Sequence, residues 1–485
     1  MHLFFTNQRL VGQWPPPTGP SADVVRDLLE HRSIPDGMPL FLDEDMRPVA
    51  PVCHWFRAMA YERRDPETMR KYAYIVRRVD GFLTKRETGL LGATEADLVA
   101  YRRSRTELQE EPVDGATWDT EAVVINLLYT FLVDQGYLRR KPLRVRRGRP
   151  SSLGSGMVRE MQVRHMTVEQ YLYLRDVGFG GQLPGAEIDE TFRGHTPHRG
   201  KAGLEFALLT GARKQEWSTL LMPEVGEGWR QPGESLEIEL QECAKYKLAR
   251  KLYVPAAAVE ALEMYFLLER AETVAKAART LARQAAELFI VDRVDAERGK
   301  LYGVHEGVRR TYTMSAMSPA LRRITVREGE AGLEPLAVFV GQGGKLLGPN
   351  SWDRLRGDAW LRMRAHAEHH EAPPLPRKRW RFHDARHTYA LQLLKYLMRL
   401  MSERDVDRAR AGGLPTTAEH MAFNPLLVVQ RRLGHKRLSS TYTYLRYLED
   451  PMNYVDDAFR EWSEHDGATY ADIALRALSL DGTAA

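Results

Sequence analysis

The fold is decided by the stretch His383-Asp-Ala-Arg386-His387-Thr388, which opens a strongly apolar segment. Apolar residues then recur at helical spacing, and this pattern predicts a buried helix; they are Tyr389, Leu393, Leu394 and Leu397. His383 and Arg386 are three positions apart, so the first turn of that helix carries both as neighbours. We therefore expect an imidazole and a guanidinium that face outward from a rigid base.

A second stretch, Thr210-Gly-Ala-Arg213-Lys-Gln-Glu216, interrupts the apolar segment that runs from residue 204 to residue 221. Gly211 predicts a backbone turn, which lets the Arg213 side chain face a shared surface. Glu216 lies three residues after Arg213 and within reach of it on a helix, so its carboxylate is expected to hold the guanidinium in place. Taken alone, an Arg-x-x-Glu pair is a common surface ion pair.

A third stretch runs from Asn424-Pro425 through Leu433-Gly-His435 to Tyr444. Asn424 predicts a helix N-cap, Pro425 predicts the first helical position, and Gly434 predicts the residue of positive φ at which a helix ends. This helix would deliver His435 just beyond its end, nine residues before Tyr444.

Arginine, histidine and tyrosine are the residue types that phosphodiester transfer needs. A guanidinium is planar, always charged and able to bind two non-bridging phosphate oxygens at once. A tyrosine hydroxyl has an ordinary pKa of about 10, so it must lose its proton as it attacks phosphorus. His383 or His435 is the expected acceptor of that proton, or a hydrogen-bond donor to the phosphate.

The order and spacing of the three stretches resemble those of the tyrosine recombinases, the phage-integrase family of DNA-breaking and DNA-joining enzymes. The resemblance spans roughly residues 50 to 450. It implies that the catalytic residues are Arg213, His383, Arg386, His435 and the nucleophile Tyr444. Glu216 and His387 would support them. Tyr442 would point to a different helix face, and Tyr447 would lie about 5 Å further along the axis, so both are weaker candidates for the nucleophile.

The family also uses a lysine in the turn of a β-hairpin to protonate the departing 5′-oxygen. Alternating residues in Leu236-Glu-Ile-Glu-Leu240 and the short segment from Arg250 to Pro255 predict such a hairpin. Its turn contains two lysines. Lys247 has the family's usual distance to the Val-Pro ending of the second strand, and we expect it to be the acid; Lys245 would suit a longer hairpin and stays an alternative.

The region from residue 52 to residue 138 shows helical spacing throughout. Asp65-Pro-Glu-Thr and Thr94-Glu-Ala-Asp predict helix starts, and Gly136 predicts the end of a third helix that begins at Trp118. These helices make a small bundle, which resembles the core-binding (SAM-like) domain that precedes the catalytic domain in tyrosine recombinases. Before them, only residues 22–31 show a helical pattern, and the rest of residues 1–48 is predicted to be irregular.

A cationic connector follows the bundle. Its basic residues stand without an acid between them; they are Arg139, Arg140, Lys141, Arg144, Arg146, Arg147 and Arg149. One interpretation is a solvated linker. We favour the other, in which the connector lies on DNA phosphates and makes binding depend on salt.

The chain is predicted to be mainly α-helical with a small antiparallel β-sheet in the catalytic domain, and to form a two-lobed clamp on DNA. The predicted parts are an N-terminal extension (1–48), the core-binding domain (49–138), the basic linker (139–160), the catalytic domain (161–455) and a C-terminal tail (456–485). Residues 256–288 are predicted to be helical. Insertions are predicted near 289–335 and 401–423. The tail contains Ile473, Leu475 and Leu478. It is expected either to dock on a neighbouring chain or to pack against its own chain.

Composition excludes several protein classes. Two cysteines, Cys53 and Cys243, make neither a disulfide framework nor a zinc site. The first residues lack the pattern of a signal peptide, and no apolar window reaches the length of a membrane span. The expected location is the cytoplasm, in association with the nucleoid. The net charge of +5 is mild, so it permits a polyanionic partner without requiring one.

Two further motifs are expected to bind nothing. Gly341-Gln-Gly-Gly-Lys345 lacks the spacing of a P-loop and the following Ser or Thr, so it predicts a turn. The run His366-Ala-Glu-His369-His370 has no second ligand cluster at fixed spacing, so no metal site is expected.

The resemblance implies a site-specific recombinase or integrase of a mobile element, acting in DNA integration or transposition. It would cut double-stranded DNA through a 3′-phosphotyrosyl intermediate, without ATP, divalent metal or other cofactor. The expected partners are paired DNA sites, three further copies of the chain in a homo-tetramer, and an accessory protein. The alternatives are DNA relaxation like that of a type IB topoisomerase, a catalytically inactive DNA-binding regulator, and a metal-dependent hydrolase built on the histidines.

Overall fold

The computed structural model divides the chain into two compact units, Met1–Glu160 and Met161–Ala485. It describes residues 1–7, 21–32, 34–143, 153–154, 163–194, 196–226, 234–410 and 424–447. Each unit buries its own hydrophobic core. Within these described ranges, no helix combines the length and the apolar character needed to cross a membrane.

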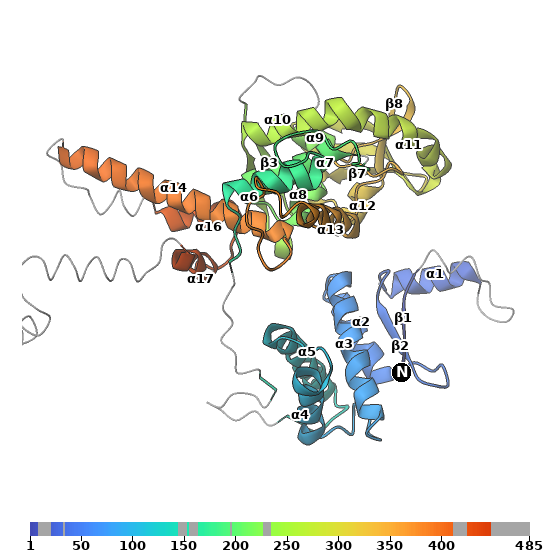
Figure 1. Cartoon of the computed structure of the whole chain (residues 1–485). Helices are drawn as coiled ribbons and strands as arrows, with labels where there is room; N and C mark the ends of the chain where they lie inside the picture. The colour runs from blue at the N-terminus through green and yellow to red at the C-terminus, as the bar shows by residue number, and fades with distance from the viewer. Residues whose placement is uncertain are drawn as a thin grey trace, which may run out of the picture. The chain divides into compact units, whose positions relative to one another are not determined.

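The first unit is a small helical bundle with a two-stranded sheet (Figure 1). Its elements are β1 (His2–Phe5), α1 (Ala22–His31), β2 (Pro39–Leu42), α2 (Ala50–Tyr61), α3 (Pro66–Thr84), α4 (Glu95–Arg103), the π-helical turn η2 (Ser104–Leu108) and α5 (Gly115–Asp134). The predicted helix starts are confirmed, because the side chains of Asp65 and Thr94 cap α3 and α4. The prediction of an irregular N-terminus was wrong for β1 and β2. These strands pair with each other across some 35 residues, and local sequence does not reveal such a pairing.

The second unit is also mainly helical. Its helices are α6 (Val168–Tyr173), α7 (Pro197–Thr210), α8 (Lys214–Ser218), α9 (Met222–Val225), α10 (Ala256–Tyr265), α11 (Ala271–Arg283), α12 (Pro319–Arg323), α13 (Pro349–Ala365), α14 (Phe382–Arg410), α16 (Pro425–Leu433) and α17 (Ser439–Tyr442). Shorter turns are η3 (Leu174–Phe179), η4 (Lys245–Lys247), η5 (Phe266–Arg270), η6 (Ala285–Glu287), η7 (Met314–Ala316) and η8 (Thr443–Tyr447). The prediction of a mainly α fold is therefore confirmed, and so is the helical segment before residue 288.

The second unit holds two sheets. The predicted hairpin is confirmed as β3 (Leu236–Leu240) paired antiparallel with β4 (Arg250–Val254). The second sheet was not predicted. It has the order β7-β6-β5-β8-β9, with β5 (Phe289–Asp295), β6 (Lys300–His305), β7 (Val308–Thr313), β8 (Thr325–Gly329) and β9 (Gly332–Pro335). β5 and β8 run parallel, so this sheet is mixed rather than antiparallel.

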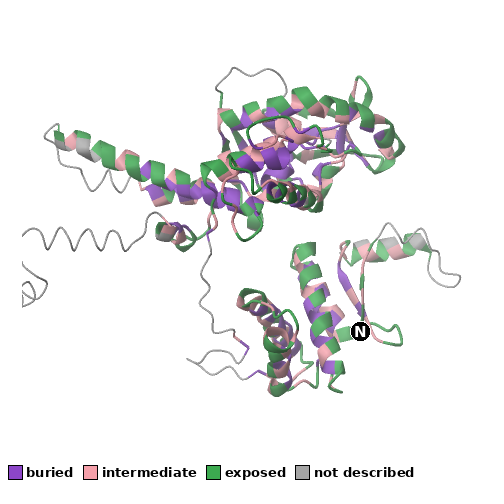
Figure 2. Ribbon diagram, viewed as in Figure 1, coloured by how far each residue is buried: buried purple, intermediate pink, exposed green. Residues whose placement is uncertain are grey.

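Helix α14 continues to Arg410 and so passes through the start of the region predicted as a second insertion, 401–423. The remainder of that region, 411–423, lies outside the described residues. Figure 2 shows buried residues along the first half of α14 and mainly exposed residues toward its far end. The half that carries the predicted motif is therefore the half that packs.

A group of buried aromatic rings packs next to the motif that begins at His383. The ring of Trp217 lies 4.6 Å from that of Trp352 and 5.2 Å from that of Phe382, and Phe339 completes the group. Trp217 directly follows Glu216, and Phe382 directly precedes His383. Aromatic packing of this kind ties α8, α13 and α14 to one rigid base.

A buried ion pair links the five-stranded sheet region to the rest of the unit. The guanidinium of Arg322 donates to both carboxylate oxygens of Glu224, at 2.6 and 2.8 Å, and also to the carbonyls of Thr219 and Met314. Both side chains are almost fully buried. Removal of one partner would leave an uncompensated charge in the interior, which costs far more than the pair itself contributes.

We therefore expect Glu224→Gln to lower the free energy of unfolding by about 3 kcal/mol. Urea unfolding followed by circular dichroism measures the change. Glu272→Gln is the matched control, because Glu272 pairs with Lys276 on the exposed face of α11 and its loss should leave the midpoint unchanged. Equal midpoints for Glu224→Gln and the parent protein would contradict this account.

Candidate active site

The first motif lies where α7 ends. Gly211 has φ +61°, and a Cβ atom there would meet the ring of Tyr389 at 2.4 Å, so only glycine fits this turn. The turn places Arg213 at the start of α8. There the backbone N–H of Arg213 donates to Glu216 Oε2 at 2.8 Å, and its Nη1 donates to Oε1 at 3.0 Å. Glu216 thus holds the arginine by both backbone and side chain.

Glu216 holds a second guanidinium as well. Arg250, the first residue of β4, donates from Nη2 to Glu216 Oε2 at 2.5 Å and from Nη1 to the carbonyl of Arg432 at 3.1 Å. Burial alone would raise the pKa of Glu216, but the charge of Arg250 and the N–H and charge of Arg213 outweigh it, and the pKa is lowered. The carboxylate therefore stays ionised between two cations. Sequence analysis had placed Arg250 only as the start of a strand.

The second motif contributes a fully buried positive charge. Arg386 is 1% exposed and donates from Nη1 to the carbonyl of Gly211 at 2.6 Å and from Nη2 to that of Leu433 at 2.5 Å. The expectation that Arg386 faces outward was wrong. Both carbonyls lie at helix C-termini, where the last carbonyls have no intrahelical partner, and the guanidinium satisfies them from inside.

The histidines of this motif differ in exposure. His383 is exposed, as expected, and its ring lies edge-on to that of His387, with centroids 4.5 Å apart. His387 is buried, and its Nδ1 lies 2.9 Å from the hydroxyl of Tyr444. The residue that the sequence placed in a supporting role is therefore the one in hydrogen-bond contact with the candidate nucleophile.

The third motif folds as its local signals predict. The side chain of Asn424 caps α16, Pro425 stands at its first turn, and Gly434 ends it with φ +61°. Beyond the helix, the backbone N–H of His435 donates to the carbonyl of Gln430. The Nδ1 atom of His435 lies 3.0 Å from Thr441 Oγ1. These contacts fix the ring parallel to that of Tyr444, with centroids 6.2 Å apart.

The structure separates the three neighbouring tyrosines. Tyr444 is 1% exposed and belongs to the histidine group. Tyr442 is 48% exposed. The hydroxyl of Tyr447 accepts the backbone N–H of Val163 at 3.2 Å. Only Tyr444 therefore shares a site with the arginines and histidines of the other two motifs.

The electrostatics of the group keep its histidines and Tyr444 uncharged. Loss of water contact, followed by the charge of Arg386 and Arg213, lowers the pKa of His435 to about 3. Burial lowers the pKa of His387 to about 3. Although His383 is exposed in part, loss of water contact and then the charges of Arg386 and Arg213 lower its pKa as well. Burial also raises the pKa of Tyr444 to about 12, although Arg386 and Arg213 act against it. At neutral pH the site thus holds neutral imidazoles and a protonated phenol beside two guanidinium groups.

The two candidate lysines lie in the hairpin turn at η4 and behave differently. The Nζ atom of Lys247 lies 2.5 Å from the carboxylate of Glu242. Lys245 is exposed, and its charge is among those that lower the pKa of both His383 and His435. Lys245 is therefore within electrostatic reach of the site, whereas the preferred residue, Lys247, is engaged elsewhere.

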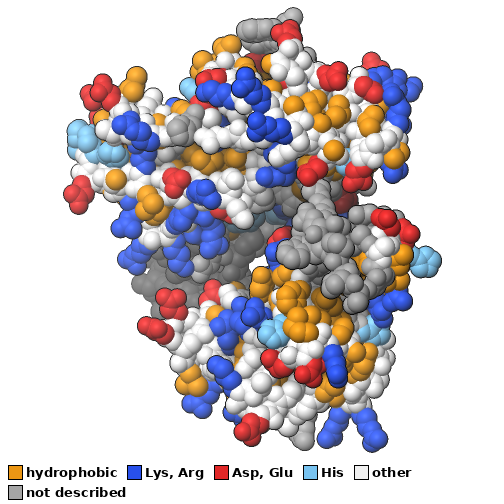
Figure 3. Space-filling model, turned by 90° about the vertical axis from the view of Figure 1, so that its right-hand side faces the viewer, with side chains coloured by type: hydrophobic (Ala, Val, Ile, Leu, Met, Phe, Trp, Pro, Cys, Tyr) orange, Lys and Arg blue, Asp and Glu red, His pale blue; other side chains and the backbone are white. Residues whose placement is uncertain are grey.

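The predicted DNA-binding connector is described only in part. Arg139 and Arg140 are exposed, and Lys141 is half-buried. The others, Arg144, Arg146, Arg147 and Arg149, lie outside the described residues, as does the C-terminal tail. Lys and Arg side chains are spread over the face of both units shown in Figure 3, with Asp and Glu among them.

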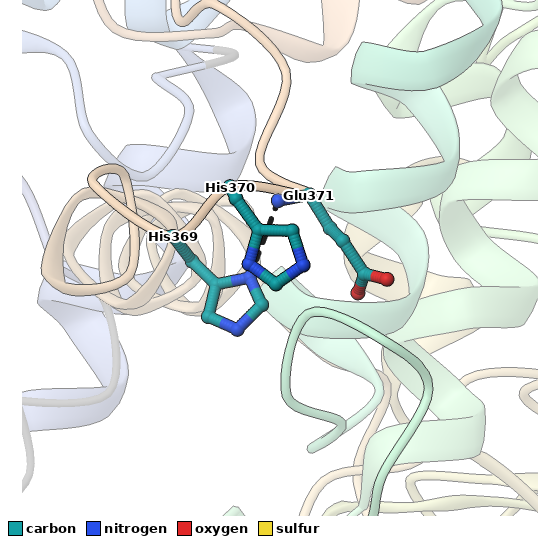
Figure 4. A group of neighbouring side chains, drawn as sticks. All are labelled: His369, His370 and Glu371. Atoms are coloured by element: carbon teal, nitrogen blue, oxygen red, sulfur yellow. Dashed lines mark hydrogen bonds between the residues drawn. The ribbon is translucent and has the colours of Figure 1, made fainter.

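Among the described residues, one group has the composition of a metal site. His369, His370 and Glu371 are consecutive, and their ligand atoms all lie within 4.8 Å of one another (Figure 4). All three are exposed, and the backbone N–H of Glu371 donates to Nδ1 of His369. None of these residues belongs to the group around Tyr444, so they add no ligand to that site.

No protein-family model matches the sequence, and no curated protein matches it. Solved structures do. The XerH site-specific recombinase in a post-cleavage complex with palindromic difH substrate is 12% identical with a TM-score of 0.48, and the match covers 93% of each chain. The Tn1549 transposon integrase in complex with circular intermediate DNA is 12% identical with a TM-score of 0.42, over 81% of this chain and 94% of that one. The XerA recombinase is 14% identical with a TM-score of 0.29, and the match covers 87% of this chain and 99% of that one.

The chain is similar to site-specific recombinases.

The buried neutral state of His387 has a measurable consequence. Its pKa is about 3 in the folded chain, against an ordinary value of 6.5. The imidazole of the unfolded chain binds a proton more tightly than that of the folded chain. The contribution of neutral His387 to the free energy of unfolding is therefore complete above about pH 6.5 and is lost as the pH falls towards 3. Between pH 7 and pH 5, we expect His387 to account for about 1–2 kcal/mol of the stability that the parent protein loses. The variant His387→Gln should lose less stability than the parent over the same pH range, by about that amount.

Urea unfolding of both proteins at the two pH values tests this expectation. His370→Gln is the control, because it changes an exposed imidazole outside the group and should keep the parent's pH dependence. An unchanged loss of stability in His387→Gln would show that this imidazole is not buried in its neutral form.

Proposed function

We propose that this protein is a site-specific DNA recombinase of the tyrosine recombinase family, which cleaves and rejoins DNA strands through a covalent link to Tyr444. The observation that carries the proposal is the contact of 2.9 Å between the Tyr444 hydroxyl and His387 Nδ1, in a group that also holds Arg213, Arg386 and His435. Three segments far apart in sequence supply these residues. A nucleophile, proton acceptors and anion-binding groups in one place are the parts that phosphoryl transfer requires.

In the proposed reaction the phosphodiester lies between Arg213 and Arg386, whose guanidinium groups bind its non-bridging oxygens. The Tyr444 oxygen attacks phosphorus as its proton passes to the neutral imidazole of His387. The bond from phosphorus to the 5′-oxygen breaks, and the 5′-oxygen takes a proton from Lys245. The products are a 3′-phosphotyrosyl link and a free 5′-hydroxyl.

Rejoining reverses these steps. A 5′-hydroxyl attacks the phosphotyrosyl link, releases Tyr444 and returns a proton to the lysine. The phosphotyrosyl link stores the energy of the broken bond, so strand joining needs no ATP. Attack by a 5′-hydroxyl from a second DNA site gives recombination, and four chains on two sites are the assembly that this exchange calls for.

The nucleophile is tested with a nicked suicide duplex that traps the covalent adduct. We expect the parent protein to form an adduct that survives EDTA, and Tyr444→Phe to lose it by at least about 1,000-fold, because the phenyl ring has no attacking oxygen. Tyr442→Phe and Tyr447→Phe are the matched controls and should keep adduct formation within a few-fold of the parent. Denaturing gel electrophoresis of labelled DNA measures all four proteins.

An adduct in Tyr444→Phe, or none in the parent protein, would contradict the proposal. The same preparation distinguishes recombination from simple relaxation. A plasmid with two target sites should exchange strands. A plasmid that loses supercoils without exchange would indicate an enzyme like the type IB topoisomerases.

The role of Lys245 is tested with a substrate in which sulfur replaces the bridging 5′-oxygen. A thiolate leaves without a proton, so the need for a general acid disappears. We expect Lys245→Ala to cleave ordinary DNA about 100-fold more slowly and to recover the parent rate on the sulfur substrate. Lys247→Ala is the control and should act like the parent on both. Rescue of Lys247→Ala instead would assign the acid to that residue.

A further inference from the structure

A cavity among the described residues of the second unit lies away from the Tyr444 group. Its volume is about 770 Å³, which is in the range of small-molecule sites. It is lined by the first turn of α7, the first turns of α13 and the Gly341–Lys345 turn, and none of its lining residues belongs to the candidate active site. Arg213 lies beyond the other end of α7. That helix has 14 residues, so the two sites are about 20 Å apart along it.

The charge of this cavity is strongly positive. Six basic residues and only one acidic residue, Asp358, line it; the basic residues are Arg193, Arg199, Arg323, Lys345, Arg354 and Arg362. Arg362 pairs with Asp189, and Arg193 donates to the carbonyl of Glu190. Among the described residues, the side chains of Arg323, Lys345 and Arg354 have no hydrogen-bond or ion-pair partner. A cavity of this kind attracts an anion.

Two buried polar atoms in the lining also lack a partner among the described residues. Arg199 is 6% exposed and uses Nη1 on the carbonyl of Val340, but its Nε has no acceptor. The Oε1 atom of Gln284 has no donor. Buried polar groups are normally satisfied, so an unpaired donor and an unpaired acceptor set the lining of this cavity apart from an ordinary surface hollow.

The glycine-rich turn contributes in a second way. It closes with a hydrogen bond from the N–H of Gly341 to the carbonyl of Lys345, which confirms the turn predicted from the sequence. Gly344 has φ +76° and packs on Ala277 and Leu281, so the turn is held by its neighbours while Gln342, Gly343 and Lys345 line the cavity. At Gly348, before α13, a Cβ atom would lie 2.9 Å from Arg323 Nη1. Absence of a side chain there leaves room for the guanidinium beside the positive end of α13.

We propose that this cavity binds a small phosphate-bearing molecule, such as a nucleotide. Lys345, Arg323 and Arg354 bind its phosphates. A single phosphate of bound DNA has the same anionic chemistry. The volume of about 770 Å³ is that of a small-molecule site, which favours the small molecule.

Isothermal titration calorimetry of the full chain with pyrophosphate and with ATP tests the proposal. We expect both probes to bind, and Lys345→Met and Arg354→Met each to weaken binding by about tenfold, because each removes a charged contact with phosphate. Arg364→Met is the matched control, since Arg364 is also an exposed arginine of α13 but does not line the cavity. Arg354 is exposed and Lys345 is half-buried, so the variants should fold.

A competition experiment distinguishes the two sources of phosphate. If a small molecule is the ligand, pyrophosphate and ATP bind while the affinity for duplex DNA is the same in Arg354→Met and Arg364→Met. If a DNA phosphate occupies the cavity, pyrophosphate displaces labelled duplex and Arg354→Met weakens duplex binding, which overturns the small-molecule assignment but keeps the phosphate site. The proposed phosphate site is overturned altogether if neither pyrophosphate nor ATP binds. It is also overturned if Arg354→Met and Arg364→Met bind these probes with equal affinity. These readouts do not depend on DNA cleavage, so they stand apart from the fate of the proposed recombinase activity.

Discussion

The buried guanidinium of Arg386 holds together the three segments on which the candidate active site is built. It donates to the carbonyl of Gly211 at the end of α7 and to that of Leu433 at the end of α16, while its own backbone belongs to α14. The turns that expose these two carbonyls also carry Arg213 and His435. One side chain therefore satisfies two helix ends and sets the positions of the neighbouring site residues.

Local sequence was sufficient to predict helix ends and to name the residues of the candidate site. Asn424 and Gly434 place the ends of α16 where the structure has them, because N-caps and residues of positive φ act within a single turn. Asp65 and Thr94 do the same in the first unit. The motif residues could be named because their types match one chemistry, and the structure brings Arg213, Arg386, His435 and Tyr444 together.

What the sequence could not predict depends on contacts between distant segments. The burial of Arg386 follows from carbonyls 175 and 47 residues away, and the contact between Arg250 and Glu216 spans 34 residues. The sheet from β5 to β9 includes a parallel pair, which no hairpin signal marks. That His387 rather than His383 contacts the tyrosine hydroxyl depends on how η8 packs against α14.

The position of Tyr444 bears on how the proposed reaction would be divided among copies of the chain. Its hydroxyl lies against His387 of the same polypeptide, and Arg213 and Arg386 of that polypeptide act on its pKa. All the residues of the candidate site thus come from a single chain. Under the proposed function, each copy of the chain would cut DNA with its own tyrosine, and contacts between copies would decide when it does so.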